Sequence, residues 1–382
     1  MTAKLAVPVL HVTDDMAALS GGVPSVVRQL ATRWAQSGQR STVLYANGDA
    51  SDLQPGVRVV KRRPAGWARV WGHSPGLRDA ASALMADVGR DGGVVHIHGL
   101  WTAMPTLTAR SAQRLALPSV FTAHGMLVPW LWTQQGLLVR SKKLLFWHLL
   151  AAPGLRRCRV VHAITPMERD ELALLLPGSN IVVIPNAIDI DPVAEATAGR
   201  EPVILFLGRI EPKKGVDILI HAFAKAGLPS HWRLHIVGPS WSDNYLAELK
   251  AIVNQVGLES RIRFLGPVFG QDKQALLDSA WVLAAPSHSE VVGLVNLEAA
   301  ARQLPSITTR QTGLFDWEEG GGLLVEPTVD DVTAGLRQAA AWSDAERQQR
   351  GVASHALVAR RYSWVSVMPM WRDLYTSIGQ LG

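Results

Sequence analysis

Residues 203–226 read VILFLGRIEPKKGVDILIHAFAKA, and this stretch indicates how the chain folds. Val203–Leu207 is a short continuous apolar run, which is typical of a parallel strand buried on both faces. The polar sequence GRIEPKKG follows, and VDILIHAFAKA then repeats apolar residues at a helical spacing. A strand, a loop and a helix in this order predict an α/β unit, in which ligands bind beside the carboxyl ends of the strands.

Strand and helix patterns alternate along the whole chain, which predicts an α/β protein with parallel sheets. We expect strands at Leu5–Val12, Ser41–Ala46, Val57–Val60, Val94–His98, Ser119–Ala123, Arg159–Ile164, Ile181–Ile184, Val203–Leu207, Arg233–Val237, Arg261–Leu265, Trp281–Ala285, Ser306–Thr309 and Gly322–Val325. We expect helices that include Pro24–Gln36, Pro75–Val88, Gly136–Leu150, Pro166–Leu176, Gly215–Ala226, Asp243–Val256, Asp272–Ala280, Val292–Arg302, Val329–Ala341 and Trp364–Ile378.

The length of 382 residues predicts two domains. Residues 191–200 are rich in small residues and lack apolar periodicity, so we interpret them as a linker between residues 1–190 and residues 201–363. The single cysteine, Cys158, excludes an internal disulfide and fits a reducing compartment, where we expect it to be a small core residue. We interpret the apolar run near the start as a first strand rather than a signal peptide, and no run approaches the roughly 18 residues of a membrane span.

Charge is distributed unevenly along the sequence. Residues 1–190 carry 20 Lys and Arg against 11 Asp and Glu, whereas residues 191–382 carry 18 against 21. Residues 92–167 contain no acidic residue at all. Within that stretch, residues 126–159 are basic, aromatic and amphipathic, which predicts binding to an anionic membrane surface. A buried helix with a few solvated cations is the alternative, and no nucleic-acid-binding module is recognisable.

Two carboxylates and two cations form the candidate site. Glu290 and Glu298 occur in PSHSEVVGLVNLE, the first on the turn after a strand and the second about two turns into the next helix. A carboxylate can accept hydrogen bonds from a pair of sugar hydroxyls, and free amides near Gly293 would face an anion. Arg209 and Lys214 would supply cations for phosphate. The alternative is that these are ordinary surface charges, as we expect of Lys213.

The sequence GRIEPKKG, followed by two glutamates separated by seven residues, resembles the donor site of retaining glycosyltransferases of the GT4 family. GGVPSVVRQLA, VVHIHGLW, FTAHG, HAITPMERDEL, IPNAID and RYSW also resemble that family in order and spacing. The resemblance implies the GT-B fold, in which two Rossmann-like, doubly wound parallel-sheet domains face a central cleft. It also implies that a C-terminal helix at about residues 364–382 packs back on the first domain.

The resemblance implies a retaining hexosyltransferase that uses a UDP- or GDP-linked sugar, with no further cofactor and no metal. Arg209 and Lys214 would stabilise the departing diphosphate, Glu290 would bind the sugar, and His124 would bind the sugar or shape the reaction centre. Glu298 would bind the ribose. The remaining donor contacts would come from Gly21, Gly22, Gly238, Val268, Val292, Gly293 and Leu294. Val291-Val292 replaces part of the usual E-G-F-G motif, which leaves the shape of the sugar pocket open.

Other polar residues are interpreted as structural. We expect this of His96, His98 and His162, and no His, Cys, Asp or Glu cluster has the spacing of metal ligands. Asp189 and Asp191 form a D-x-D pattern, but they lie in or beside the linker rather than after a buried strand.

The leading hypothesis is a cytoplasmic enzyme, peripheral on the inner face of the cytoplasmic membrane, that extends a lipid-linked glycan such as a lipopolysaccharide or another polysaccharide intermediate. A soluble glycosyltransferase with a small-molecule acceptor is the second hypothesis. A GT-B phosphorylase or epimerase and a non-catalytic protein that binds sugar nucleotides are further alternatives.

Overall fold

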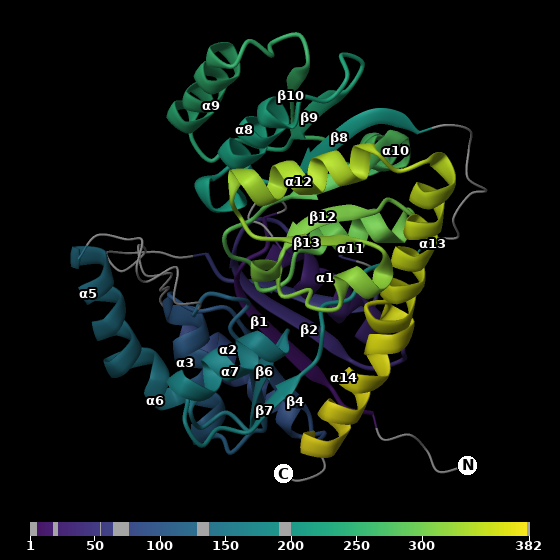
Figure 1. Cartoon of the computed structure of the whole chain (residues 1–382). Coiled ribbons are helices and arrows are strands. Elements are labelled where there is room, and N and C mark those ends of the chain that lie inside the picture. The colour runs from purple at the N-terminus through teal and green to yellow at the C-terminus, as the bar shows by residue number, and fades with distance from the viewer. Residues whose placement is uncertain are drawn as a thin grey trace. The chain divides into compact units, whose positions relative to one another are not determined.

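The computed structural model describes residues 6–17, 22–53, 55–63, 76–127, 137–190 and 200–379. The chain divides into two compact units (Figure 1). Unit 1 comprises Met1–Asn186 with Val367–Gly382, and unit 2 comprises Ala187–Ser366. Residues 191–199, which form most of the expected linker, lie outside the described residues.

Unit 1 contains a seven-stranded sheet in the order β3-β2-β1-β4-β5-β6-β7, and every neighbouring pair of strands is parallel. Its strands are β1 (Val9–Asp15), β2 (Ser41–Asn47), β3 (Val57–Lys61), β4 (Val94–His98), β5 (Ser119–Thr122), β6 (Val160–Ala163) and β7 (Ile181–Val183). Its helices are α1 (Gly22–Gln36), α2 (Leu77–Gly89), α3 (Ala103–Arg114), α5 (Leu137–Phe146), the π-helical turn η3 (Trp147–Ala151), α6 (Ala152–Leu155), α7 (Pro166–Leu175) and, from Val367 onwards, α14 (Trp364–Gly379).

Both faces of the unit 1 sheet are covered, as the buried apolar strands predict. Leu10 and Val12 of β1 belong to a core that also contains buried residues of α2, α3 and α7. Val43 of β2 belongs to a core on α1 instead. The α14 helix contacts the sheet through Tyr375, whose hydroxyl lies 2.7 Å from Nδ1 of His96 on β4. The Tyr375 ring also lies edge-on to Trp34 of α1, with 4.9 Å between the ring centroids.

Unit 2 contains a six-stranded parallel sheet in the order β10-β9-β8-β11-β12-β13. Its strands are β8 (Glu201–Leu207), β9 (Arg233–Val237), β10 (Ile262–Gly266), β11 (Ala280–Ala285), β12 (Ser306–Thr309) and β13 (Leu323–Val325). Its helices are the short 3-10 turns η4 (Pro212–Lys214), η5 (Arg310–Thr312) and η6 (Trp317–Gly320), with α8 (Val216–Ala226), α9 (Asp243–Gln255), α10 (Gly270–Ser279), α11 (Leu294–Ala301), α12 (Val329–Ala340) and α13 (Asp344–Arg361).

The central strand β8 shows why this sheet is doubly wound. Ile204 and Phe206 point into a core shared with α8, α9 and α12, whereas Leu205 and Leu207 point into a core shared with α10 and α11. The chain leaves β8 for β9 on one side and later returns to place β11 on the other. The carboxyl ends of β8 and β11 therefore flank a topological switch point, where open α/β sheets bind their ligands.

The predicted class, α/β with two parallel sheets, is confirmed, and each expected strand overlaps an observed one. The first strand was placed too early, because β1 continues to Asp15 and pairs there with Asn47 of β2. The helix expected at Gly136–Leu150 is α5 followed by the π-helical η3. Among the described helices, none combines the length and hydrophobicity that a membrane span needs.

Candidate functional site

In unit 2, close packing of backbone brings the loops after β8 and β11 together. Gly215 has a φ of 66°, and a Cβ there would lie 2.3 Å from the carbonyl oxygen of Pro286. His288 also donates its backbone N–H to the carbonyl oxygen of Lys213, at 2.8 Å. Only glycine tolerates both the positive φ and the approach at residue 215. These contacts hold the two loops in register at the edge of the sheet.

Lys214 and Glu290 form an ion pair across these two loops. Ser287 donates its hydroxyl to the same carboxylate oxygen at 3.0 Å, and the Glu290 N–H donates to the Gln311 carbonyl at 2.8 Å. The side chains of Lys214 and Glu290 are 18% and 15% exposed, so solvent screens this pair less than a surface pair. Two of the four predicted catalytic residues therefore lie in direct contact.

Arg209 is more exposed, at 38%, and its guanidinium lies 3.9 Å from Glu211. Lys213 lies 3.6 Å from the same glutamate. Pairs of this length and exposure contribute little to stability. Arg209 is thus free to exchange Glu211 for a ligand at low energetic cost.

Glu298 lies on α11 and pairs with Lys273 of α10 at 2.7 Å. The side chains of Glu298 and Lys273 are 36% and 30% exposed. The sequence did not point to Lys273 as the partner of Glu298. Lys273 lies 25 residues before Glu298 on another helix, and no motif connects the two residues. Because both side chains are about one third exposed, Glu298 can exchange Lys273 for a ligand at low energetic cost.

The start of α11 differs from the expectation of free amides. Gly293 donates its N–H to the Thr312 carbonyl at 3.1 Å, and Leu294 donates to the Val292 carbonyl at 2.9 Å. These two amides already have partners, so an anion would have to displace a carbonyl to reach them. The side chain of Val292 is buried, which leaves its backbone as the part that could face a ligand.

Two further predicted donor contacts follow β9 and β10. Gly238 has a φ of 143°, and a Cβ at this residue would lie 1.9 Å from the carbonyl oxygen of Gly208. The backbones after β8 and β9 therefore touch. Val268 packs its side chain against the core beside α10, which again leaves backbone for a ligand.

In unit 1, His124 follows β5 and adopts a φ of 51°, an uncommon conformation for a residue with a side chain. Burial lowers the pKa of His124 to about 3, so its imidazole is neutral at physiological pH. The next residue, Gly125, donates its N–H to Glu168 of α7 at 2.8 Å, and Ile164 donates to the other oxygen of Glu168 at 2.7 Å.

Glu168 is buried, and desolvation raises its pKa to about 7 although two backbone N–H groups favour its charged form. Sequence reasoning did not single out Glu168. Its signal was the Thr165-x-x-Glu168 spacing of a helix start, and the Thr165 hydroxyl does accept the Glu168 N–H at 3.2 Å. Glu168 positions the turn that carries His124.

Gly21 lies outside the described residues, and Gly22 is the exposed first residue of α1. Asp191 also lies outside them, so the D-x-D pattern is described only at Asp189, which is exposed. Cys158, expected to be a small core residue, is buried, and burial raises the pKa of its thiol to about 11.

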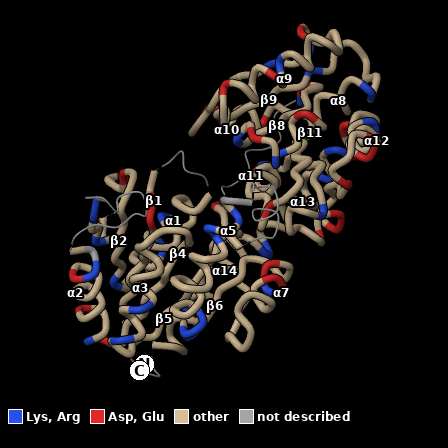
Figure 2. Tube along the Cα trace, turned by 90° about the vertical axis from the view of Figure 1, so that its left-hand side faces the viewer, with Lys and Arg blue, Asp and Glu red and all other residues tan. Residues whose placement is uncertain are grey.

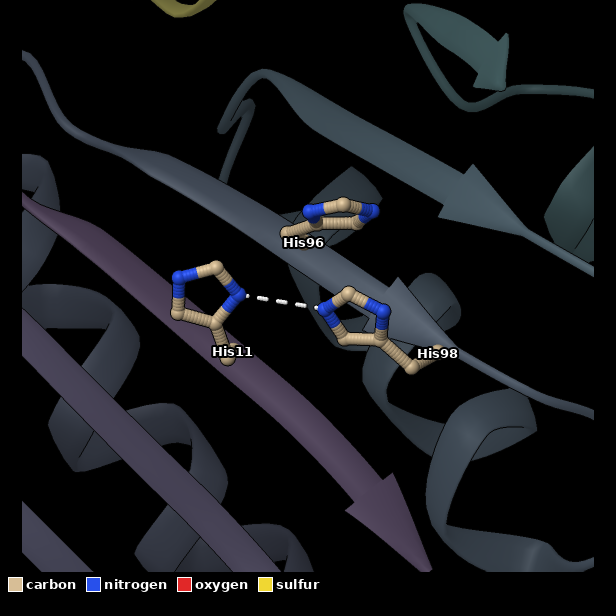
Figure 3. A group of neighbouring side chains, drawn as sticks. All are labelled: His11, His96 and His98. Carbon is tan, nitrogen blue, oxygen red and sulfur yellow. Dashed lines mark hydrogen bonds between the residues drawn. The ribbon is translucent and has the colours of Figure 1, made fainter. Parts of the chain in front are cut away.

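The structure brings together histidines that sequence spacing could not connect. One ring nitrogen from each of His11, His96 and His98 could reach a single ion, because these atoms lie within 4.8 Å of one another. Figure 3 shows the three rings on β1 and β4. Hydrogen bonds already engage both nitrogens of His96, both nitrogens of His98 and Nδ1 of His11. A metal would have to break several of these bonds, so the residues fit a hydrogen-bonded network better than a metal centre.

The structure describes the basic segment at residues 126–127 and 137–159. Figure 2 shows Lys and Arg but no acidic residue along α5. Its aromatic members Phe146 and Trp147 are buried, whereas Leu145 and Leu149 are 62% and 61% exposed. The exposed apolar surface of the described part of this segment is therefore formed by aliphatic side chains, mainly leucines, rather than by the described aromatic rings.

Comparison with known proteins agrees with this architecture. The family model "Glycosyltransferase Family 4" matches residues 20–192, and "Glycosyl transferases group 1" matches residues 188–350. A D-inositol 3-phosphate glycosyltransferase of Xylanimonas cellulosilytica is 28% identical over 93% of this chain and 91% of its own.

Two solved structures share the fold. A sucrose-phosphate synthase from Thermosynechococcus elongatus superposes with a TM-score of 0.79 at 21% identity, over 98% of this chain and 100% of its own. Anabaena HepE in complex with UDP and glucose gives a TM-score of 0.75 at 18% identity, over 97% and 100% of the two chains. The two parallel-sheet units are thus those of the GT-B fold.

Proposed function

We propose that this chain, which belongs to the GT4 glycosyltransferases, transfers a hexose from a nucleotide-diphosphate sugar with retention of anomeric configuration. The observation that carries the proposal is the Lys214–Glu290 pair at the switch point of unit 2, with Arg209 on the same loop as Lys214. A cation and a carboxylate in contact there suit a ligand that is anionic at one end and rich in hydroxyls at the other.

The chemistry follows from the charges. When the anomeric C–O bond breaks, negative charge develops on the departing diphosphate, and Arg209 and Lys214 stabilise it where it forms. Glu290, already tied to Lys214 and Ser287, accepts hydrogen bonds from hydroxyls of the transferred sugar. Glu298 accepts those of the ribose. In a retaining transfer the acceptor attacks from the side of the leaving group, and a phosphate oxygen receives its proton.

His124 contributes as a neutral group. Because its pKa lies near 3, it neither competes with Arg209 for the phosphates nor carries a charge toward a developing oxocarbenium ion. It acts as a hydrogen-bonding partner of the sugar. Two fixed cations perform the role that a divalent ion has in other phosphate chemistry, so we expect turnover to survive a chelator.

The proposed acceptor is a lipid-linked glycan at an anionic membrane surface. The exposed Leu145 and Leu149 lie on a segment without acidic residues, and Arg110 donates to the carbonyl oxygens of Leu149 and Leu150 at 3.1 Å. Exposed leucines beside cations match an interfacial helix. The protein would then act from the cytoplasmic side, as a peripheral protein on the inner face of the membrane.

A small phosphorylated polyol is the second candidate acceptor. The relative that matches nearly the whole chain is named as a glycosyltransferase of D-inositol 3-phosphate. In this case the exposed leucines would have no role in transfer. Lipid vesicles would then change neither the affinity for the acceptor nor the rate of transfer.

Donor use is tested by a thermal-shift panel of UDP-, GDP- and ADP-linked hexoses, followed by turnover with and without EDTA. The proposal predicts that one of these donors stabilises the wild type and is turned over in EDTA. Arg209→Ala and Glu298→Ala should each reduce that turnover severalfold or more. Retention of full turnover by both variants would refute the site assignment.

The acceptor class is tested by co-sedimentation with phosphatidylglycerol-containing and phosphatidylcholine-only vesicles. Leu149→Ser should weaken binding to the anionic vesicles. Leu174→Ser is the matched control, because Leu174 is 84% exposed on α7, outside the basic segment. Absence of wild-type binding to either vesicle, together with transfer to D-inositol 3-phosphate, would replace the first candidate by the second.

A further inference from the structure

Three histidines on neighbouring strands of unit 1 form a continuous hydrogen-bonded chain. Nδ1 of His11 lies 3.1 Å from Nε2 of His98, and Nδ1 of His98 lies 3.0 Å from Nε2 of His124. His11 lies on β1, His98 ends β4, and His124 follows β5, which are successive strands of the sheet. Figure 3 shows the first of these contacts. This series of hydrogen bonds therefore runs from the buried His11 to His124, which the proposed function assigns to the reaction centre.

All three rings are neutral, because burial lowers the pKa of His11 and His124 to about 3 and that of His98 well below 6.5. A neutral imidazole carries one N–H, so His98 can donate to only one of its two neighbours. The direction of the hydrogen bond at one contact consequently fixes the direction at the other. Only two arrangements of the chain are possible, and they differ in which nitrogen of His124 carries the proton.

His11, at the buried end of this series of hydrogen bonds, decides between these two arrangements. Nε2 of His11 is buried and has no hydrogen-bond partner. If the chain ran inward, this atom would be a buried N–H without an acceptor, whereas an outward chain leaves only an unpaired acceptor. Orphaned buried N–H groups are rarer than under-satisfied acceptors. The outward direction is therefore favoured: His11 donates to His98, and His98 donates to Nε2 of His124.

In a separate series of hydrogen bonds, the direction of each bond can be derived, because the series ends at a carbonyl oxygen, which can only accept. Nε2 of His162 contacts the Ile184 carbonyl at 2.7 Å, and a carbonyl oxygen only accepts. Nδ1 of His162 must then accept from Thr122, whose hydroxyl oxygen accepts from Nε2 of His96. Nδ1 of His96 finally accepts from Tyr375. His96 and His162 are thus Nε2–H tautomers, and every bond in this branch is satisfied.

We propose that His11 and His98 are positioning residues that hold His124 as its Nδ1–H tautomer, so that His124 presents a hydrogen-bond donor to its ligand. Nδ1 of His124 has no partner among the described residues, which leaves that donor available. The positive φ of His124 aims the ring, and the histidine chain sets which of its nitrogens carries the proton. The inferred use of that donor, on an oxygen of the sugar or its acceptor, rests on the proposed function. The tautomer itself does not.

The direct test is ¹⁵N NMR of the full-length, histidine-labelled protein without ligand, which distinguishes protonated from bare ring nitrogens. We expect Nδ1–H signals for His11, His98 and His124, and Nε2–H signals for His96 and His162. Single substitutions assign each signal. An Nε2–H signal for His124 would overturn the inference.

Two variants of His98 separate a positioning role from a packing role. His98→Asn keeps an amide N–H near the position of Nδ1, whereas His98→Leu fills space without a donor. We expect His124 to keep its Nδ1–H signal in the Asn variant and to lose it in the Leu variant. Unchanged signals from His96 and His162 in both variants would show that the fold persists. The same tautomer of His124 in both variants would contradict the inference.

Turnover provides the second readout, with UDP-glucose as the first probe and any donor identified by the thermal-shift panel thereafter. We expect kcat to fall about tenfold or more in His98→Leu and less than threefold in His98→Asn, since one hydrogen bond to the reacting ligand is at stake. A merely structural His98 would give the reverse order, because Leu packs better than Asn in an apolar core. An Nδ1–H signal without turnover of any donor would refute the proposed function but not the tautomer.

Discussion

The two units place different chemistry at the carboxyl ends of their strands. Unit 1 presents neutral histidines linked by hydrogen bonds, with the half-buried His124 at the end of this series. Unit 2 presents half-exposed charges in ion pairs, of which Lys214–Glu290 is the most buried. Both are parallel sheets of similar topology, so the difference arises from the loop and strand-end residues rather than from the fold.

The difference matches two kinds of ligand. Exposed ion pairs are weak and can exchange their partners for phosphate and hydroxyl groups, which suits a charged donor. A neutral histidine chain has little affinity for phosphate, but it can orient one hydrogen bond toward a sugar. Under the proposed function, we therefore expect unit 2 to bind the donor and His124 of unit 1 to offer a hydrogen bond to the sugar.

The largest expected difference between the two units is in their stability at low pH. Burial lowers the pKa of His11, His96, His98, His124 and His162 in the folded state, so unfolding lets them bind protons below pH 6.5, and stability is lost as the pH falls. At pH 5, His11, His124 and His162, whose pKa values in the folded state are about 3 to 4, each contribute about 2 kcal/mol of destabilisation. None of the described histidines of unit 2 is buried.

Hydrogen exchange measured by mass spectrometry at pH 7 and pH 5, corrected for the intrinsic rate, should show β4 and β5 losing more protection than β8 and β11. Equal losses in the two units would show that the buried histidines do not control acid stability.

Removal of Arg209 should reduce turnover strongly. Arg209→Ala removes a fixed cation from the departing diphosphate, and kcat should fall about 100-fold, as it does when other preorganised groups of this kind are lost. Arg209→Lys should recover part of this loss, because it restores the charge but not the fork of donors. Steady-state kinetics with the donor found by the thermal-shift panel measures both. A decrease of less than threefold in Arg209→Ala would remove Arg209 from the site.

Glu168 should produce a pH dependence of opposite sign within unit 1. Its pKa is raised from 4.5 to about 7, so its contribution to stability is fully present below pH 4.5 and is lost as the pH rises through 7. The loss amounts to about 3 kcal/mol at most. The difference in melting temperature between the wild type and Glu168→Gln should therefore change between pH 5 and pH 8. A constant difference would contradict the raised pKa.

Removal of the Glu298 carboxylate should have the smallest effect of these changes, and the effect should be specific for the 2′-hydroxyl of the ribose. If it binds the ribose, the wild type should bind UDP about tenfold more tightly than 2′-deoxy-UDP, since a charged hydrogen bond is lost. Glu298→Ala should bind both equally. Isothermal titration checks this ratio, with Glu248→Ala of α9 as a control that keeps the discrimination. Loss of affinity for both nucleotides with the ratio intact would assign Glu298 another role.

Local sequence patterns predicted the elements but not how they meet. Val203–Leu207 could be recognised as a buried strand because its apolar run is continuous, and β8 covers it. The α13 helix was not predicted, because its polar surface hides the apolar period, although Ser343 and Glu346 form a capping box at its start. The polar end of β1 was missed because pairing with β2, rather than local propensity, keeps Thr13 and Asp15 extended.

As with the fold, the sequence predicted individual site residues but not all of the contacts between them. Lys214 and Glu290 lie on loops that each follow a strand, so their meeting follows once β8 and β11 are neighbours. The contact of His11 with His98 spans 87 residues and depends on the strand order. Order within a parallel sheet is set by which helices cover which face, and no single segment of the sequence specifies it.

The most direct test of the central claim compares two adjacent lysines. Lys214 contacts Glu290 at the switch point, whereas Lys213 lies beside Glu211, with its Nζ 3.6 Å from that carboxylate. Single-turnover cleavage of the identified nucleotide sugar should slow about 100-fold in Lys214→Ala and less than threefold in Lys213→Ala. Equal rates in the two variants would contradict the assignment of the donor site to this edge of unit 2.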